Sequence, residues 1–204
     1  MIGVLMVLAY LLGATPTSQI VARVFHGVDL RKHGSGNLGA TNTFRVLGWR
    51  AAAPVMVVDV LKGWVPTVYF PRWDGVEPLE WALGYGAAAI VGHVFSVFVG
   101  FRGGKGVATS AGVFMALAPW AVLIAGVLWG VIVTLTRVVS LASLVAAIVL
   151  PIAVFVTGEP PLEFWVSIGL GLFVVYAHRS NIRRLMRGEE SRFLRKTGKE
   201  TGKV

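Results

Sequence analysis

The chain has 204 residues, of which 55% are hydrophobic and only 14% are charged. A soluble domain carries about 25% charged residues, so this composition excludes a soluble globular enzyme, a disordered chain and a soluble coiled coil. The apolar residues cluster in blocks that approach the roughly 20 residues needed to cross a bilayer, which predicts an all-α polytopic membrane protein. The chain has no cysteine, so disulfides and thiolate chemistry are excluded, and its four histidines are too dispersed to suggest a structural zinc site.

Seven apolar stretches predict a bundle of seven transmembrane spans, in a single domain that covers residues 1–204. They are residues 2–24, 51–70, 81–99, 107–118, 120–136, 138–156 and 162–177. No Lys or Arg precedes the first stretch, so it is interpreted as a retained span and not as a cleaved signal peptide. One helix over 107–136 would measure about 45 Å against a bilayer core of about 30 Å. Pro119 offers the break that divides it into two spans.

The distribution of basic residues predicts the orientation. With seven spans, one side of the membrane receives the segments 20–50 and 100–106, Arg137 and the tail from residue 178, which together hold 17 of the 19 Lys and Arg residues. The opposite connections hold Arg72 and the acidic residues Asp74, Glu77, Glu80, Glu159 and Glu163. The positive-inside rule then places the N-terminus outside and the C-terminus in the cytoplasm. The net charge of +9 is interpreted as orientation and attraction to anionic lipid, and no nucleic-acid partner is expected.

Three polar segments fall on the cytoplasmic side, and the first runs from residue 34 to residue 45. Its closely spaced glycines let backbone N–H groups turn toward one point and form an anion-binding nest. Ser35, Thr41 and Asn42 add neutral donors, and Arg45 adds a planar guanidinium suited to phosphate. A flexible turn followed by a helix cap explains the same residues, so both interpretations stay open at this point.

The second segment contains His93 and the sequence Gly-Gly-Lys-Gly at 103–106. It is not a nucleotide-binding P-loop, because Val99 and Gly106 occupy positions where that pattern needs Gly and Ser or Thr. Lys105 lies among glycines just before an expected helix, whose first N–H groups are available to an anion. The alternative is an interfacial lysine beside a tight turn. His93 fits either the site or a packed, hydrogen-bonded position.

The third segment runs from His178 to Glu190. If it is helical, His178 and Asn181 lie three residues apart on one face, and a histidine at this membrane end can act near neutral pH. A basic juxtamembrane helix that contacts anionic headgroups is the alternative. Within the second span, Asp59 and Lys62 are three residues apart, and a mutual ion pair is the preferred interpretation over a role in the site.

Together the three segments resemble the three motifs of the bacterial acyl-phosphate:glycerol-3-phosphate acyltransferase family. The first motif corresponds to Ser35, Gly36, Asn37, Leu38, Gly39, Ala40, Thr41, Asn42 and Arg45. The second corresponds to Gly92, His93, Val94 and Phe95 with residues 103–109, and the third to His178, Arg179, Asn181, Ile182, Arg184, Leu185, Gly188 and Glu189. Asp59, Lys62 and Gly63 also fit. The chain departs from the family at Ser96, where Pro is common, and at Arg102, where Lys is usual.

The resemblance implies a multi-pass enzyme of the bacterial inner membrane with its active site on the cytoplasmic face. It implies transfer of a fatty acyl group from acyl phosphate to the sn-1 hydroxyl of glycerol-3-phosphate, which gives lysophosphatidic acid and inorganic phosphate for phospholipid biosynthesis. No metal or cofactor is implied. The expected partners are the two substrates and membrane lipids, and the chain is expected to be a monomer.

The same resemblance, together with the chemistry of the side chains, assigns the expected site residues. His178 orients or deprotonates the attacking hydroxyl, Asn181 polarises the acyl carbonyl, and Lys105 stabilises charge on the departing phosphate. The expected substrate-binding residues are Ser35, Gly36, Asn37, Thr41, Asn42, Arg45, His93, Gly103, Gly104 and Gly106. A small transporter of anions or lipids is the competing interpretation, because glycine-rich half-helices and basic residues also suit phosphate translocation.

Overall fold

The computed structural model describes residues 1–75 and 79–192, and every regular element within those ranges is helical. The elements are α1 (Ile2–Ala14), α2 (Thr17–His26), η1 (Leu30–Lys32), α3 (Ala40–Leu47), α4 (Trp49–Asp74), α5 (Leu79–Val94), η2 (Val97–Val99), α6 (Val107–Leu117), α7 (Pro119–Thr136), α8 (Val139–Val156), α9 (Pro161–Ala177) and α10 (Arg179–Met186). Glu77 and the tail residues Arg195, Lys196, Lys199 and Lys203, which entered the charge count, lie outside the described residues.

Four helical segments among the described residues are long and apolar enough to cross a bilayer, and the number rises to six if each of two bent pairs is one span. The four are α4, Leu79–Val99, α7 and α8. The bent pairs are α1 with α2, at 45°, and α9 with α10, at 59°. Helix α6 is apolar but has only 11 residues, about 16 Å, or half of a bilayer core. The all-helical fold is therefore confirmed, with four to six candidate spans among the described residues.

Proline residues explain two of the breaks between consecutive helices. The predicted span 2–24 is interrupted at Thr15 and Pro16, because the proline precedes α2 and has no N–H to continue α1. Pro119 stands at the first position of α7, where its missing N–H costs nothing, and it separates α6 from α7 as predicted. These breaks leave helix ends inside the fold, where their polar groups need partners.

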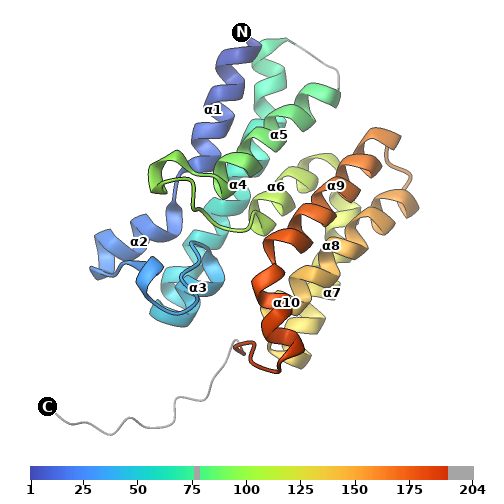
Figure 1. Cartoon of the computed structure of the whole chain (residues 1–204). Helices are drawn as coiled ribbons and strands as arrows, with labels where there is room; N and C mark the ends of the chain where they lie inside the picture. Colours follow the sequence, from blue (N-terminus) through green and yellow to red (C-terminus); the bar gives the residue numbers. More distant parts are fainter. Residues whose placement is uncertain (76–78, 193–204) are drawn as a thin grey trace, which may run out of the picture.

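The helices form two groups with α6 between them (Figure 1). Helices α1, α4 and α5 pack together in one group, and α7, α8 and α9 pack in the other. Helix α6 crosses α4 closely, because Gly63 of α4 lies against the Thr109 carbonyl and Gly112 of α6 lies against the Val60 carbonyl. Any Cβ at these two glycines would overlap the facing backbone, which is the small-residue packing that membrane helices favour.

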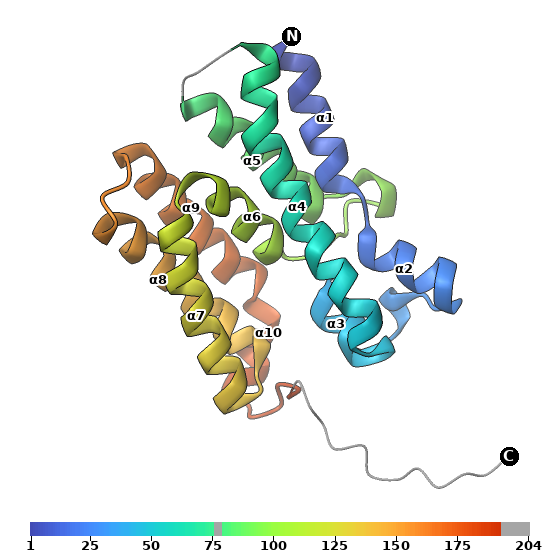
Figure 2. The same ribbon diagram turned by 180° about the vertical axis from the view of Figure 1, so that it is seen from behind.

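Figure 2 shows the same bundle from behind and locates the basic segments. Helices α2, α3 and α10 lie toward one end of the bundle, and residue 1 and the α8–α9 connection lie toward the other end in both views. The first and third polar segments, which are far apart in sequence, therefore share one end of the molecule.

Candidate functional site

A cavity of about 400 Å³ lies between the two helix groups. Its walls come from α3, α4, α6, α7, α8 and α9, and the segment after α9 contributes to its polar end. Ten of the thirteen predicted site residues line it: Ser35, Asn37, Thr41, Asn42, Arg45, His93, Lys105, Gly106, His178 and Asn181. The structure thus brings the three polar segments to one place, as the sequence predicted.

The first segment reaches the cavity through α3 and is held there by Asn42. This side chain is buried, accepts from the backbone N–H of Ser35 at 2.8 Å, and donates to the carbonyls of His33 at 3.1 Å and Leu30 at 3.3 Å. Asn42 therefore fixes the loop against α3. The start of α3, with Ala40 and Thr41, also lines the cavity, and the first N–H groups of a helix have no acceptor within it.

The glycines of the second segment divide into two kinds. Gly106 has φ of 82°, a left-handed conformation that favours glycine, and it starts α6 at the cavity wall. Gly103 and Gly104 do not line the main cavity; their N–H groups donate to the carbonyls of Val94 at 2.9 Å and His93 at 3.1 Å. These two glycines hold the loop that presents Lys105. Gly36, also predicted as a substrate ligand, is a turn residue with φ of 70° and does not line the cavity.

A chain of hydrogen bonds connects Lys105 to the C-terminal segment. Lys105 Nζ donates to Asn181 Oδ1, and Asn181 Nδ2 donates to Glu190 Oε1 at 2.6 Å. Glu190 also accepts from Ser140 of α8 at 2.8 Å and from Arg184 of α10 at 2.6 Å. The carboxylate thereby joins α8, α10 and the Lys105 loop.

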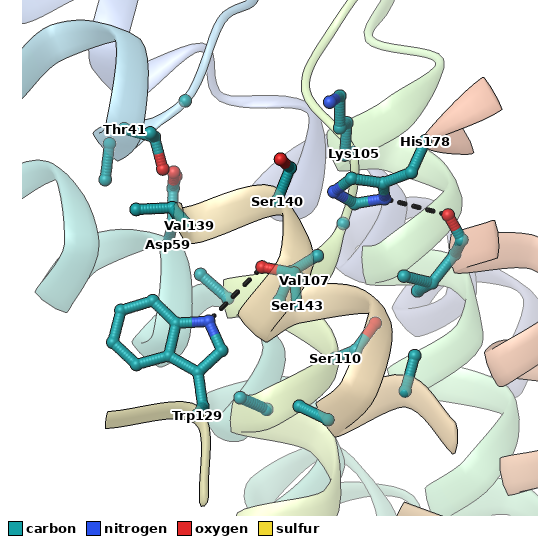
Figure 3. Close-up of a pocket in the computed structure, with 18 of the residues that line it drawn as sticks. Thr41, Asp59, Lys105, Val107, Ser110, Trp129, Val139, Ser140, Ser143 and His178 are labelled. Atoms are coloured by element: carbon teal, nitrogen blue, oxygen red, sulfur yellow. Dashed lines mark hydrogen bonds between the residues drawn. The ribbon is translucent and has the colours of Figure 1, made fainter. Parts of the chain in front are cut away.

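His178 stands at the bend between α9 and α10 and lines the cavity beside Lys105 (Figure 3). Its Nδ1 lies 2.8 Å from the carbonyl of Val174, the bond drawn as a dashed line in Figure 3. A carbonyl only accepts, so Nδ1 carries the proton and Nε2 is the acceptor in the neutral ring. This tautomer suits a group that receives a proton from a hydroxyl.

Among the described residues, two cations that line the cavity, Arg45 and Lys105, form no ion pair. Of the two carboxylates that line it, Glu190 is paired with Arg184 at 2.6 Å and Asp59 is paired with Lys62 at 2.7 Å. Among the ion pairs of the described residues, none involves Arg45 or Lys105. The polar end of the cavity is therefore positively charged and suited to anions.

Two ionisation constants at this end reflect the same arrangement. Burial lowers the pKa of Lys105 to about 8, although the charge of Glu190 opposes the shift. Burial by itself would raise the pKa of Glu190, but hydrogen bonds from Arg184, Asn181 and Ser140 outweigh it and the net shift is downward. Glu190 is thus held as a carboxylate, and Lys105 loses its proton within the mildly alkaline range.

The remaining cavity wall is mostly apolar and comes from α6, α7, α8 and α9. Its apolar members include Met115, Val122, Ala125, Ala146, Leu150 and Leu170. Trp129 of α7 donates its ring N–H to Ser143 of α8 at 3.2 Å, as Figure 3 shows. A cationic end and an apolar slot together fit a ligand with an anionic head and a hydrocarbon chain.

Three contributors to this site, Glu190, Ser140 and Trp129, are not among the residues predicted from the sequence. The third motif had been matched through Glu189, which is exposed, whereas the adjacent Glu190 binds the other groups. Ser140 and Trp129 lie in apolar stretches without a motif, so only the packing of α7 against α8 reveals them. The predicted Asp59–Lys62 pair is confirmed.

The chain is similar to proteins of one family over most of its length. The family model described as glycerol-3-phosphate acyltransferase matches residues 3–188. Curated proteins named glycerol-3-phosphate acyltransferase are similar to it: one from Geobacter sulfurreducens is 42% identical, covering 93% of this chain and 96% of that protein, and one from Desulforudis audaxviator is 46% identical, covering 91% and 92%.

Two solved structures are similar to the chain over nearly its full length. Both are of PlsY (YgiH), described as an integral membrane glycerol 3-phosphate acyltransferase. Its glycerol 3-phosphate form has a TM-score of 0.88 at 40% identity and covers 95% of this chain and 96% of that one. Its lysophosphatidic acid form has a TM-score of 0.85 at 39% identity, with 94% of each chain covered.

Proposed function

Because the chain belongs to the glycerol-3-phosphate acyltransferase family, we propose that it acylates the sn-1 hydroxyl of glycerol-3-phosphate with acyl phosphate as donor. The products are lysophosphatidic acid and inorganic phosphate. The main support for this proposal is that Arg45 and Lys105, at the polar end of a mostly apolar cavity, form no ion pair with the described residues. Two substrates that each carry a phosphate need two such charges, and one of them also carries an acyl chain.

The reaction follows from this placement. The hydroxyl oxygen attacks the acyl carbonyl, the bond between the acyl carbon and the phosphate oxygen breaks, and phosphate departs with the electron pair. Phosphate is a good leaving group from a mixed anhydride, so holding the substrates together supplies much of the rate. Lys105 and the first N–H groups of α3 and α6 stabilise the negative charge that develops on the departing phosphate.

The proton of the attacking hydroxyl has two possible acceptors at this site. Nε2 of His178 is free to accept it, because Nδ1 is bonded to the Val174 carbonyl. The departing phosphate is the other acceptor, since its second ionisation lies near pH ~6. In both cases Asn181, held by Glu190, polarises the acyl carbonyl or positions the hydroxyl. No acyl-enzyme is needed, and we propose direct transfer within one domain of a monomer.

We also propose the membrane topology that the charges favour: seven crossings, with α6 as a short one, in the bacterial inner membrane and with the cavity's polar end facing the cytoplasm. The gathering of α2, α3 and α10 at one end of the bundle supports it. A reporter that is active only in the cytoplasm should report when fused to the C-terminus and stay silent when inserted after Asp74. The reverse pattern would contradict this orientation.

The donor is tested with purified protein in detergent, where no sealed compartment exists. We expect lysophosphatidic acid and inorganic phosphate in equal amounts from glycerol-3-phosphate and palmitoyl phosphate, and no product from palmitoyl-CoA or palmitoyl-acyl carrier protein. Product from a thioester donor would overturn the donor assignment. Phosphate flux in vesicles without product in detergent would favour the transporter instead.

Lys105 gives a prediction with a defined pH dependence. Because a lysine is cationic only below its pKa, and that of Lys105 is about 8, kcat/KM should fall as the pH rises through about 8. Lys105→Arg should remove this alkaline limb, since arginine stays charged. Lys105→Ala should lose at least ~10-fold at pH 7, because a contact to a charged phosphate contributes ~1.5–3 kcal/mol.

The matched control for Lys105 is Arg102, an exposed basic residue of the same loop that does not line the cavity. Arg102→Ala should keep activity within about 2-fold of the unchanged protein, as expected for a surface substitution. If Arg102→Ala and Lys105→Ala lower the activity equally, the basic residues of this loop act through general attraction to the anionic membrane. The assignment of Lys105 to a phosphate site would then be wrong.

A further inference from the structure

The buried Asp59–Lys62 pair of α4 has no part in the mechanism above. Both residues are buried, at 2% and 4% exposure, and Lys62 Nζ lies 2.7 Å from Asp59 Oδ1. An ion pair inside a membrane protein costs desolvation energy that well-packed apolar residues would avoid. Its neighbours therefore indicate what else the pair contributes.

Lys62 connects the pair to the end of α1. Its Nζ donates to the carbonyl of Thr15 at 3.1 Å, at the break between α1 and α2. The adjacent carbonyl of Ala14 accepts from the buried hydroxyl of Ser96 at 2.5 Å. A cation at a helix C-terminus is also favoured by the helix dipole. Lys62 is thus bound to the end of α1, which Ser96 holds against the segment after α5.

Asp59 connects the pair to the Lys105 loop through His93. Asp59 Oδ1 lies 3.9 Å from His93 Nδ1, and the His93 carbonyl accepts from the N–H of Gly104 at 3.1 Å. The other ring nitrogen, Nε2, faces Gly104 so closely that a Cβ there would overlap it. Gly104 directly precedes Lys105, so a shift of the His93 ring moves the backbone that presents the lysine.

We propose that the Asp59–Lys62 pair is a positioning element for Lys105, acting through His93 and the Gly103–Gly104 backbone. This inference rests on the proposed function, in which Lys105 binds phosphate. It also gives His93, predicted as a substrate-binding residue, a positioning role, because its ring lies between Asp59 and Gly104. The Asp59 oxygen that faces His93 holds the imidazole ring in place. Lys62 neutralises the charge of the Asp59 carboxylate, which lies beside an anion site.

Two double variants separate positioning from simple stabilisation. Asp59→Leu/Lys62→Met removes both charges and the oxygen that faces His93, and Asp59→Asn/Lys62→Met removes the charges but keeps an oxygen there. Replacing a whole buried ion pair by neutral groups preserves folding better than removing one partner. We expect both variants to keep a thermal midpoint close to that of the unchanged protein.

The kinetic constants should differ between these variants. For Asp59→Leu/Lys62→Met we expect the KM for glycerol-3-phosphate to rise at least ~10-fold with a smaller change in kcat, because a displaced Lys105 binds phosphate poorly. For Asp59→Asn/Lys62→Met we expect most of this increase in KM to disappear. The control is Arg23→Met, which breaks the exposed Arg23–Asp29 pair far from the cavity and should change neither constant.

Three results would overturn the inference: full activity of Asp59→Leu/Lys62→Met, equal impairment of the two double variants, or equal impairment by Arg23→Met. If the double variants do not fold, His93→Phe keeps the ring against Gly104 and removes the nitrogen that faces Asp59, and it should raise the same KM. Wild-type protein without acyl transfer from any donor would instead refute the proposed function. In that case the thermal shift produced by glycerol-3-phosphate, compared between wild type and variants, still tests the positioning role.

Discussion

Lys105 donates its hydrogen bond to the neutral amide of Asn181, and this contact keeps the lysine charge available to a ligand. A carboxylate in the same place would have neutralised it. Among the described residues, the carboxylate that joins this hydrogen-bond chain is Glu190, which contacts Asn181 and not Lys105 and has Arg184 as its own partner. Within the described part of the chain, Arg45 and Lys105 are therefore the cavity's cations that form no ion pair, and the proposed phosphate binding depends on them.

The membrane fold provides the surroundings that make these two charges effective. Glycine-mediated packing of α6 against α4 brings the first turn of α6 to the wall that α3 also reaches. An apolar slot continues from that polar end between α6, α7, α8 and α9. In this partly dehydrated place, fixed cations and helix N-termini act more strongly on phosphate than they would in water.

Much of this arrangement was predictable from the sequence, because membrane helices and local motifs leave strong patterns. Hydropathy located the helices, Pro119 marked a helix start, and the i, i+3 spacing predicted the Asp59–Lys62 pair. The bend at Pro16 was missed because an apolar stretch reads as one span whether or not it is straight. Helix α6, predicted as a span over residues 107–118, has 11 residues and reaches half of a bilayer core, a shortness that hydropathy does not reveal.

Other parts of the site depend on contacts between distant segments, which no local pattern reveals. Glu190 joins α8 and α10 to Asn181 from outside any helix, so sequence could not distinguish it from Glu189. Gly103 and Gly104 were predicted to bind substrate because glycines near a lysine suit phosphate. In the fold their N–H groups donate to the carbonyls of Val94 and His93, so these glycines hold the loop in place.

We propose that Arg45 and Lys105 hold two phosphate-bearing substrates at the same time. Calorimetric titration of glycerol-3-phosphate into protein saturated with a non-hydrolysable acyl phosphonate tests it directly. We predict a ternary complex, in which glycerol-3-phosphate still binds one-to-one with little change in Kd. Competitive binding, with the apparent Kd rising in proportion to the phosphonate concentration, would show one phosphate site and contradict direct transfer between two bound substrates.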